Sequence, residues 1–146
     1  MEFADWEPVY ERILADFGFG RAGDERARDV LAALVADPLA PDAVPCGGTV
    51  AVAGAAPSLR DDLHTVRTAD HVFAASSAAA VLRDHGLTPD AVVTDLDGRP
   101  LVVRALAAEG VPAVVHAHGD NVPTLRRHVP RFPSRTVLPT TQAAPR

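Results

Sequence analysis

The chain has 146 residues, which is the length of one ordinary domain and is enough to bury a core without disulfides or structural metals. Apolar residues make up 47% of it and aromatic residues only 5%, a composition typical of a folded protein packed from small side chains. The formal net charge of -5 provides no basic surface for nucleic acid, and no apolar run is long enough to span a membrane, so neither partner is expected.

The compartment is indicated by the cysteine content and by the first residues. Cys46 is the only cysteine, so it cannot form an internal disulfide, and no metal-ligand spacing surrounds it. The chain does not begin with the basic and apolar segments of a secretory signal. These features predict a cytoplasmic protein.

Residues 1–45 are expected to form a helical segment that packs on the rest of the chain. Large apolar residues recur at helical spacing from Asp5 to about Phe17, and glycines then end the pattern. We expect Asp24 to cap a second helix. The apolar stripe of that helix consists of Ala27, Val30, Leu31, Leu34 and Val35.

Residues 46–146 alternate between short apolar runs, polar loops and helical stretches, and this predicts an α/β domain. The runs lie at residues 49–53, 72–75, 91–93 and 113–115, and Val137 is placed to begin a fifth. Such alternation predicts a parallel sheet with right-handed crossover helices covering both faces. The polar loops after the strands should then gather at the carboxyl edge of the sheet, where ligands bind near a switch in strand order.

The first two of these loops carry weak signals. Gly54 to Ser58 could offer backbone N–H groups and a hydroxyl to an anion, but the stretch lacks the pattern of a P-loop. Ser76 and Ser77 are expected to be helix caps. The arginines expected nearest to the site are Arg60, Arg126 and Arg127.

The third loop, Thr94-Asp95-Leu96-Asp97-Gly98, carries the strongest signal. Asp95 and Asp97 are two residues apart at a strand end, so both carboxylates should lie on the same side of the backbone. Two carboxylates suit Mg²⁺, which fills its other positions with water and phosphate oxygens. The alternative is a tight Asp-Gly turn without a ligand.

The fourth loop, His116-Ala117-His118-Gly119-Asp120-Asn121, places four polar groups and a glycine directly after a buried strand. A zinc site would need a third ligand beside the two histidines, and none lies close by in the sequence. We expect this loop to contact phosphate or substrate, with Asp120 as an additional partner for a metal or a hydroxyl. Capping of the next helix by Asp120 or Asn121 is the alternative.

Several of these motifs, taken in order, resemble one family. They are Trp6-x-x-x-Tyr10 with Asp16-Phe17-Gly18-Phe19, Gly54-x-x-Pro57-Ser58-Leu59, the run from Pro89 to Gly98, and the loop from His116 to Asn121. Together they are similar to the archaeal 6-hydroxymethyl-7,8-dihydropterin pyrophosphokinases of the MptE type. The resemblance covers nearly the whole chain.

The resemblance implies a thiamin-pyrophosphokinase-like fold and an ATP-dependent reaction with Mg²⁺. In that reaction, diphosphate passes from ATP to the hydroxymethyl group of 6-hydroxymethyl-7,8-dihydropterin and AMP is released, in folate or methanopterin biosynthesis. By this resemblance Asp95 and Asp97 hold the metal and act in catalysis together with Asp120. The implied substrate- and nucleotide-binding residues are Gly54, Pro57, Ser58, Thr94, Gly98, His116, His118, Gly119 and Asn121.

The chain also departs from the family pattern. Ala56 stands where the family usually has a second glycine, and Ser76-Ser77 stands in place of an Asp-Gly pair that would add an acidic ligand. Family members also continue beyond the region matched here, so the resemblance implies an α/β domain that is incomplete at its C-terminal side.

Two other functions remain open at this point. Asp95-Leu96-Asp97-Gly98 imitates the nucleophile loop of haloacid-dehalogenase-like phosphatases, in which the first aspartate attacks phosphorus and the second acts as acid and base. A nucleotide- or pterin-binding module without catalysis is the other reading. In each case the partners would be small molecules, and a homo-oligomer is compatible with the sequence.

Overall fold

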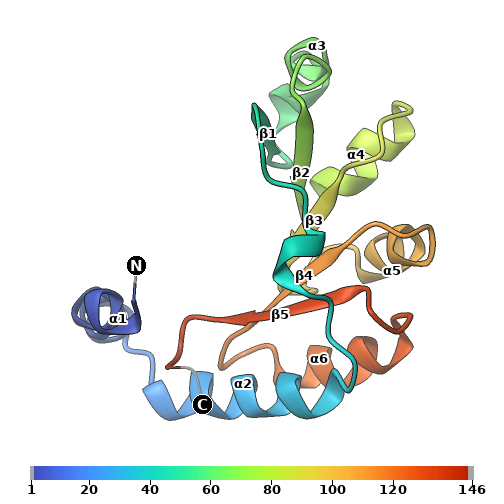
Figure 1. Cartoon of the computed structure of the whole chain (residues 1–146). Coiled ribbons are helices and arrows are strands. Elements are labelled where there is room, and N and C mark those ends of the chain that lie inside the picture. Colours follow the sequence, from blue (N-terminus) through green and yellow to red (C-terminus); the bar gives the residue numbers. More distant parts are fainter. Residues whose placement is uncertain (1, 145–146) are drawn as a thin grey trace.

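The computed structural model describes residues 2–144 and shows an α/β fold preceded by a helical segment (Figure 1). The helices are α1 (Phe3–Phe17), α2 (Arg21–Leu34), α3 (Leu63–Val66), α4 (Ala78–Asp84), α5 (Pro100–Ala108) and α6 (Val122–His128), with 3-10 turns η1 (Pro41–Ala43), η2 (Pro57–Arg60) and η3 (Val129–Arg131). The strands are β1 (Val50–Ala53), β2 (His71–Ala75), β3 (Ala91–Thr94), β4 (Ala113–Ala117) and β5 (Val137–Thr141). The expected elements, including the fifth strand, are therefore confirmed.

The strands are all parallel and lie side by side in the order β1-β2-β3-β4-β5. Every crossover therefore moves in the same direction along the sheet. Right-handed crossovers of this kind place their helices on one face, and Figure 1 shows α4 and α5 on the same side of the sheet, with α3 at its β1 end and α6 at its β5 end. The expected switch in strand order is wrong for the described strands, because their order never reverses. The loops after the strands still share the carboxyl edge of the sheet.

The core lies between the sheet and these crossover helices. Strand residues such as Val92 and Val115 are buried there against helix residues such as Leu82, Leu106 and Leu125. Small side chains, mostly alanine and valine, let the helices approach the sheet closely. This face of the sheet is packed as expected.

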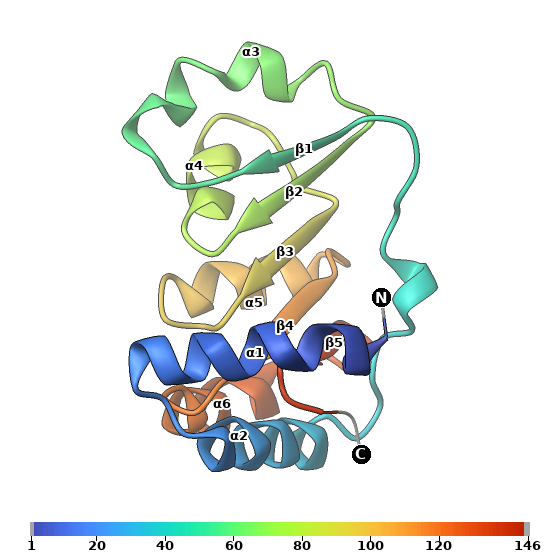
Figure 2. The ribbon, with the colours of Figure 1, turned by 90° about the vertical axis from the view of Figure 1, so that its left-hand side faces the viewer.

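The other face of the sheet is covered only in part. In Figure 2, α1 lies in front of β4 and β5, on the side away from α4 and α5, and no described helix covers β1, β2 and the start of β3 there. Val52 is 78% exposed, and Val50 and Val93 are also exposed. The expectation that both faces are covered is therefore wrong for this half of the sheet, because crossovers in one direction supply helices to one face only.

The N-terminal segment packs through fewer residues than its pattern predicts. In α1 only Tyr10 and Leu14 are buried, whereas Phe17 and Phe19 are exposed and stack on each other with centroids 5.9 Å apart. The α2 helix packs on α6 and β5, with Ala27 and Leu31 buried. None of the helices in residues 2–144 combines the length and apolarity needed to cross a membrane.

The expected role of Asp24 as a helix cap is wrong. The N-cap of α2 is Gly20, and Asp24 lies one turn into the helix with only 5% of its surface exposed. Its carboxylate is turned away from the backbone of its own helix, because it accepts hydrogen bonds from three other parts of the chain.

Candidate functional site

The acidic loop, residues 94–98, follows β3 and is held by the two residues whose side chains point inward. The Thr94 hydroxyl is buried, accepts a hydrogen bond from the Leu96 N–H at 2.8 Å and lies 3.0 Å from the Ser76 hydroxyl. Leu96 has a φ of 69°, a strained conformation for a residue with a side chain, and its side chain is buried. Burial of Leu96 offsets this strain, and of the flanking carboxylates Asp97 is exposed and Asp95 is half-buried.

Asp95 and Asp97 form an electrostatically linked pair. The Asp97 N–H donates to Oδ1 of Asp95 at 3.2 Å. The pKa of Asp97 is raised above its ordinary value by its hydrogen bond with Asp95, by burial and by the Asp95 charge. Burial opposes the charge on Asp95, but hydrogen bonds from Asp97 outweigh it and lower the pKa of Asp95. Two carboxylates this close repel each other when both are ionised, so the pair favours a cation.

The donor set of this pair fits a hard divalent cation. Carboxylate oxygens are the protein ligands that Mg²⁺ prefers, and Mg²⁺ normally takes only one or two of them beside water and phosphate oxygens. No group of three or more His, Cys, Asp or Glu side chains placed to hold a metal ion occurs within residues 2–144. Asp95 and Asp97 are the candidate ligands.

Asn121 joins the acidic loop to the histidine loop, residues 116–121. Its side-chain amide donates to the carbonyl oxygens of Asp95 at 3.0 Å and His116 at 2.8 Å, and its oxygen accepts from the His118 N–H at 3.0 Å. Asn121 is buried, and both of its N–H groups and its oxygen are engaged within the chain. Asn121 therefore cross-links the acidic loop and the histidine loop by hydrogen bonds.

The two histidines of this loop face different neighbours. Nε2 of His118 lies 3.5 Å from Oδ2 of Asp95, so protonated His118 forms an ion pair with the acidic loop. His116 is half-buried, and its Nδ1 lies 3.3 Å from the Thr140 hydroxyl on β5. Burial, and secondarily the charge of His118, lower the pKa of His116. The structure therefore brings His118, and not His116, directly to the acidic pair.

Asp24 fixes the histidine loop from the N-terminal segment, a role that sequence reasoning missed. Its Oδ1 accepts from the Gly119 N–H at 2.7 Å, and its Oδ2 accepts from the Tyr10 hydroxyl at 2.8 Å and from the Gln142 amide at 2.9 Å. Burial opposes the charge, but the hydrogen bonds from Gln142, Tyr10 and Gly119 lower the pKa of Asp24. Burial and the neighbouring Asp24 in turn raise the pKa of Tyr10. No local pattern identifies such a contact, because Asp24 and Gly119 are 95 positions apart.

Two of the predicted binding glycines lie where the backbone passes close to another segment. A Cβ on Gly119 would lie 3.3 Å from the backbone of Gly23, and a Cβ on Gly98 would lie 2.7 Å from the Ser77 hydroxyl. Glycine at these positions lets α2 approach the histidine loop and lets the acidic loop approach the turn after β2. Each glycine thus has a packing reason beside any contact with a ligand.

Two cavities lie near the acidic loop, one lined by His118, which lies 3.5 Å from Asp95, and the other lined by Asp97 itself. The first, which we call the histidine-side cavity, measures about 430 Å³ and is lined by Phe19, Gly20, Gly23, Asp24, Arg26, His116, His118, Gly119, Asp120 and Gln142. The second, which we call the arginine-side cavity, measures about 340 Å³ and is lined by Leu96, Asp97, Gly98, Pro100, Pro123, Thr124, Arg127 and His128. Of the arginines expected near the site, Arg127 is the one that lines a cavity together with an acidic-loop carboxylate.

The loop after β1 is not joined to the acidic loop by any hydrogen bond within residues 2–144. Gly54 and Ser58 line a separate cavity of about 440 Å³ with Ala53, Leu59 and other residues of β1, η2 and α3. Pro57 begins η2, the 3-10 turn that follows. One strand, β2, lies between β1 and β3, the strand that the acidic loop follows.

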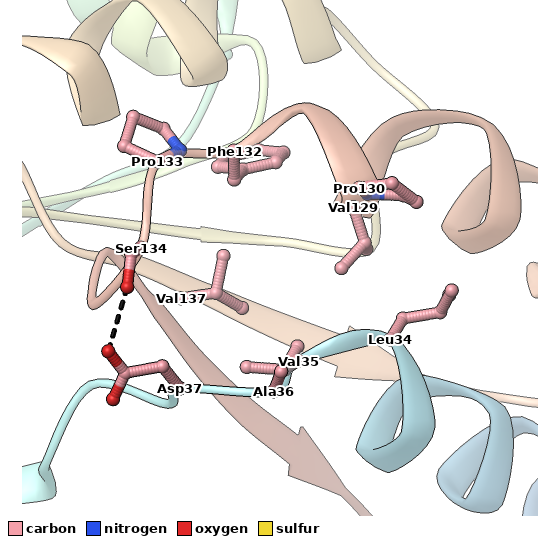
Figure 3. Close-up of a pocket in the computed structure, with 10 residues that line it drawn as sticks. All are labelled: Leu34, Val35, Ala36, Asp37, Val129, Pro130, Phe132, Pro133, Ser134 and Val137. Carbon is pink, nitrogen blue, oxygen red and sulfur yellow. Dashed lines mark hydrogen bonds between the residues drawn. The ribbon is translucent and has the colours of Figure 1, made fainter.

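A further cavity of about 220 Å³ lies at the opposite end of the sheet, between the end of α2 and η3 (Figure 3). Its walls are mainly apolar, as the side chains of Leu34, Val129 and Val137 in the close-up show. Its one acid, Asp37, is bound by the Ser134 hydroxyl at 2.7 Å and by Arg135. This cavity lies beside the amino end of β5, away from the carboxyl edge that carries the acidic pair.

Comparison with known proteins agrees with the geometry at the carboxyl edge. The family model described as 6-hydroxymethylpterin diphosphokinase MptE-like matches residues 33–144. This range includes the sheet, the acidic loop and the histidine loop. The chain belongs to the MptE-like family. The matched range leaves out α1 and most of α2, so Tyr10 and Asp24 lie outside it.

The MptE-like chain is also similar to three curated archaeal proteins, each named 6-hydroxymethyl-7,8-dihydropterin pyrophosphokinase. It is 39% identical to that of Methanothermobacter thermautotrophicus and 38% identical to that of Pyrococcus furiosus, in each case over 99% of this chain and 64% of the relative. It is 28% identical to that of Methanocaldococcus jannaschii over 90% of this chain and 59% of the relative. The chain therefore spans less than two thirds of the length of these relatives.

Proposed function

We propose that this MptE-like chain carries the active site of a pyrophosphokinase that transfers diphosphate from ATP to the hydroxymethyl group of 6-hydroxymethyl-7,8-dihydropterin. The linked pair of Asp95 and Asp97 at the carboxyl edge of the sheet, with Asp97 lining one cavity and Asp95 beside the His118 that lines another, is the observation that carries the proposal. The names of the archaeal relatives supply the substrate. Folate or methanopterin biosynthesis is the pathway in which we place this reaction.

In this reaction the hydroxyl oxygen of the pterin forms a bond to the β-phosphorus of ATP. The bond from that phosphorus to the oxygen bridging to the α-phosphate breaks, AMP leaves, and the hydroxyl proton is lost. Such a transfer needs positioning and charge neutralisation rather than a covalent nucleophile. Mg²⁺ bound at Asp95 and Asp97 would supply most of the neutralisation, as the acidic pair fits that ion.

The other groups around the acidic pair support the same chemistry. Arg127 lines the arginine-side cavity and adds a permanent positive charge for phosphate oxygens. The Asp120 carboxylate lines the histidine-side cavity, has no hydrogen-bond or ion partner among the described residues, and suits the role of accepting the hydrogen bond of the pterin hydroxyl. Asn121 and Asp24 act as positioning residues, since they hold the loops that carry these groups.

The test is AMP formation from ATP, Mg²⁺ and 6-hydroxymethyl-7,8-dihydropterin, with Asp97→Ala and Asp95→Asn beside the parent chain. Both variants should lose metal-dependent activity by at least about 100-fold, the usual scale for removing a group that neutralises a transferring phosphate. Asp84→Ala, which removes an exposed carboxylate of α4, is the matched control and should keep full activity. Full activity in Asp97→Ala would refute the assignment of the acidic loop.

The same assay separates the two alternatives. Binding of Mg-ATP and pterin in calorimetry without AMP formation would favour a binding module. Release of inorganic phosphate from small phosphomonoesters, abolished by Asp95→Asn, would favour a phosphatase.

A further inference from the structure

We infer that the histidine-side cavity receives the pterin ring and that the arginine-side cavity receives the phosphates of ATP. This inference rests on the proposed function and deepens it, because it assigns each substrate to one cavity. The starting observation is that two cavities with different linings adjoin the acidic pair, one through His118 beside Asp95 and the other through Asp97 itself.

The geometry of the transfer requires two such sites. The attacking hydroxyl and the departing AMP lie on opposite sides of the transferred phosphorus, so acceptor and donor must approach the metal from different directions. His118, at 3.5 Å from Asp95, connects the histidine-side cavity to the acidic pair, and Asp97 itself lines the arginine-side cavity. A substrate in each cavity can therefore reach the same metal.

The lining of the histidine-side cavity suits a flat, polar ring. Phe19 lies at its rim with 54% of its surface exposed, so one aromatic face is available for stacking. Arg26 is exposed and has no hydrogen-bond or ion partner within residues 2–144, so its guanidinium can donate to the ring carbonyl oxygen. At about 430 Å³, the cavity falls in the usual range of small-molecule sites, roughly 300–1,000 Å³.

The lining of the arginine-side cavity differs in the features that matter. No Phe, Tyr or Trp lines it, whereas Arg127, His128 and the Thr124 hydroxyl offer donors to anionic oxygens. A pterin ring would find no stacking surface there. The phosphate oxygens of ATP would meet the positive charge of Arg127, which also offsets the negative charge of Asp97 in the same cavity.

The test measures the two substrates separately. Binding of 6-hydroxymethylpterin, the oxidised fluorescent form of the ring, is titrated without ATP, and KM for ATP is measured in the AMP assay. Phe19→Ala and Arg26→Ala should each weaken pterin binding about tenfold, which corresponds to about 1.4 kcal/mol, while leaving KM for ATP within about twofold. Arg127→Ala should raise KM for ATP about tenfold while leaving pterin binding within about twofold.

A matched control for Arg26→Ala exists on the neighbouring helix, because Arg12→Ala removes an exposed arginine of α1 that does not line the cavity. Arg12→Ala should bind pterin like the parent chain. Phe19→Tyr, which keeps an aromatic face, should retain most of the affinity. Circular dichroism verifies that each variant is folded.

The outcomes separate this inference from the proposed function. If the parent chain forms AMP but Phe19→Ala and Arg26→Ala bind pterin normally, or if Arg127→Ala weakens pterin binding instead, the assignment of the cavities is overturned and the reaction stands. If pterin binds with the expected pattern but no AMP forms, the assignment of the pterin to the histidine-side cavity stands and the reaction falls. A parent chain that binds no pterin overturns the assignment.

Discussion

Replacing Asp24 by alanine is expected to destabilise the whole chain although Asp24 lies outside the range matched by the family model. The substitution removes the acceptor of three hydrogen bonds, donated by the Tyr10 hydroxyl, the Gly119 N–H and the Gln142 amide. Alanine fits the interior of α2 well, so the cost comes from the donors that lose their acceptor.

The loss in free energy of unfolding depends on whether each donor can form a hydrogen bond with water in place of Asp24. Tyr10 is fully buried, so its hydroxyl stays without a partner, at a cost of about 1–3 kcal/mol. The Gly119 N–H is partly buried and contributes a similar or smaller cost, whereas the half-exposed Gln142 can turn to solvent. The free energy of unfolding should fall by about 3 kcal/mol, which for a chain of this size lowers Tm by roughly 6–12 °C.

Urea unfolding followed by circular dichroism measures this change, with Glu25→Ala as the control because it removes a carboxylate from the next position of the same helix. The pKa of Asp24 is lowered in the folded state, so the stability gained from its charge is present above the unfolded pKa of about 4 and is lost as pH falls through the folded pKa. The difference in free energy of unfolding between the parent chain and Asp24→Ala should therefore decrease below about pH 4. If Asp24→Ala at pH 7 lowers the free energy of unfolding no more than Glu25→Ala does, the reasoning is refuted.

Two further predictions concern the packing of the sheet and of the acidic loop. Val92→Ala on the covered face should cost about 2 kcal/mol in urea unfolding, while Val52→Ala on the open face should cost less than about 0.5 kcal/mol; equal costs would show that the open face is covered in solution. Gly98→Ala should cost about 1–3 kcal/mol, because its Cβ would meet the Ser77 hydroxyl at 2.7 Å, and a Ser77→Ala background should relieve most of that cost in a double-mutant cycle. Additive effects of the two changes would contradict this contact.

The sequence predicted those parts of the site that depend on local pattern. Alternating apolar runs placed Asp95, Asp97 and His118 directly after buried strands, and parallel strands bring such positions to one edge whatever the strand order is. This is why the acidic loop and the histidine loop could be expected to meet even though the expected switch in strand order is wrong.

The sequence could not predict contacts that depend on how α1 and α2 dock. The local pattern predicts a helix cap at Asp24, because an acidic residue near the start of a helix usually serves that purpose. The side chain instead lies against Gly119, and the approach is close because Gly23 and Gly119 both lack a Cβ. The place of Phe19 at the rim of a cavity depends on the same docking, which no local pattern indicates.

The residues of the two loop motifs fall into two groups, those whose polar atoms are hydrogen-bonded within the chain and those whose polar atoms can still bind a ligand. Thr94 and Asn121 use their polar atoms inside the chain, and Gly98 gives room to the neighbouring turn, so these residues shape the loops. Asp97 and Asp120, by contrast, are exposed and face the two cavities. Substitutions in the first group should therefore lower stability and activity together, whereas substitutions in the second should lower activity alone, because only the second group has bonding capacity that a substrate or metal can take up.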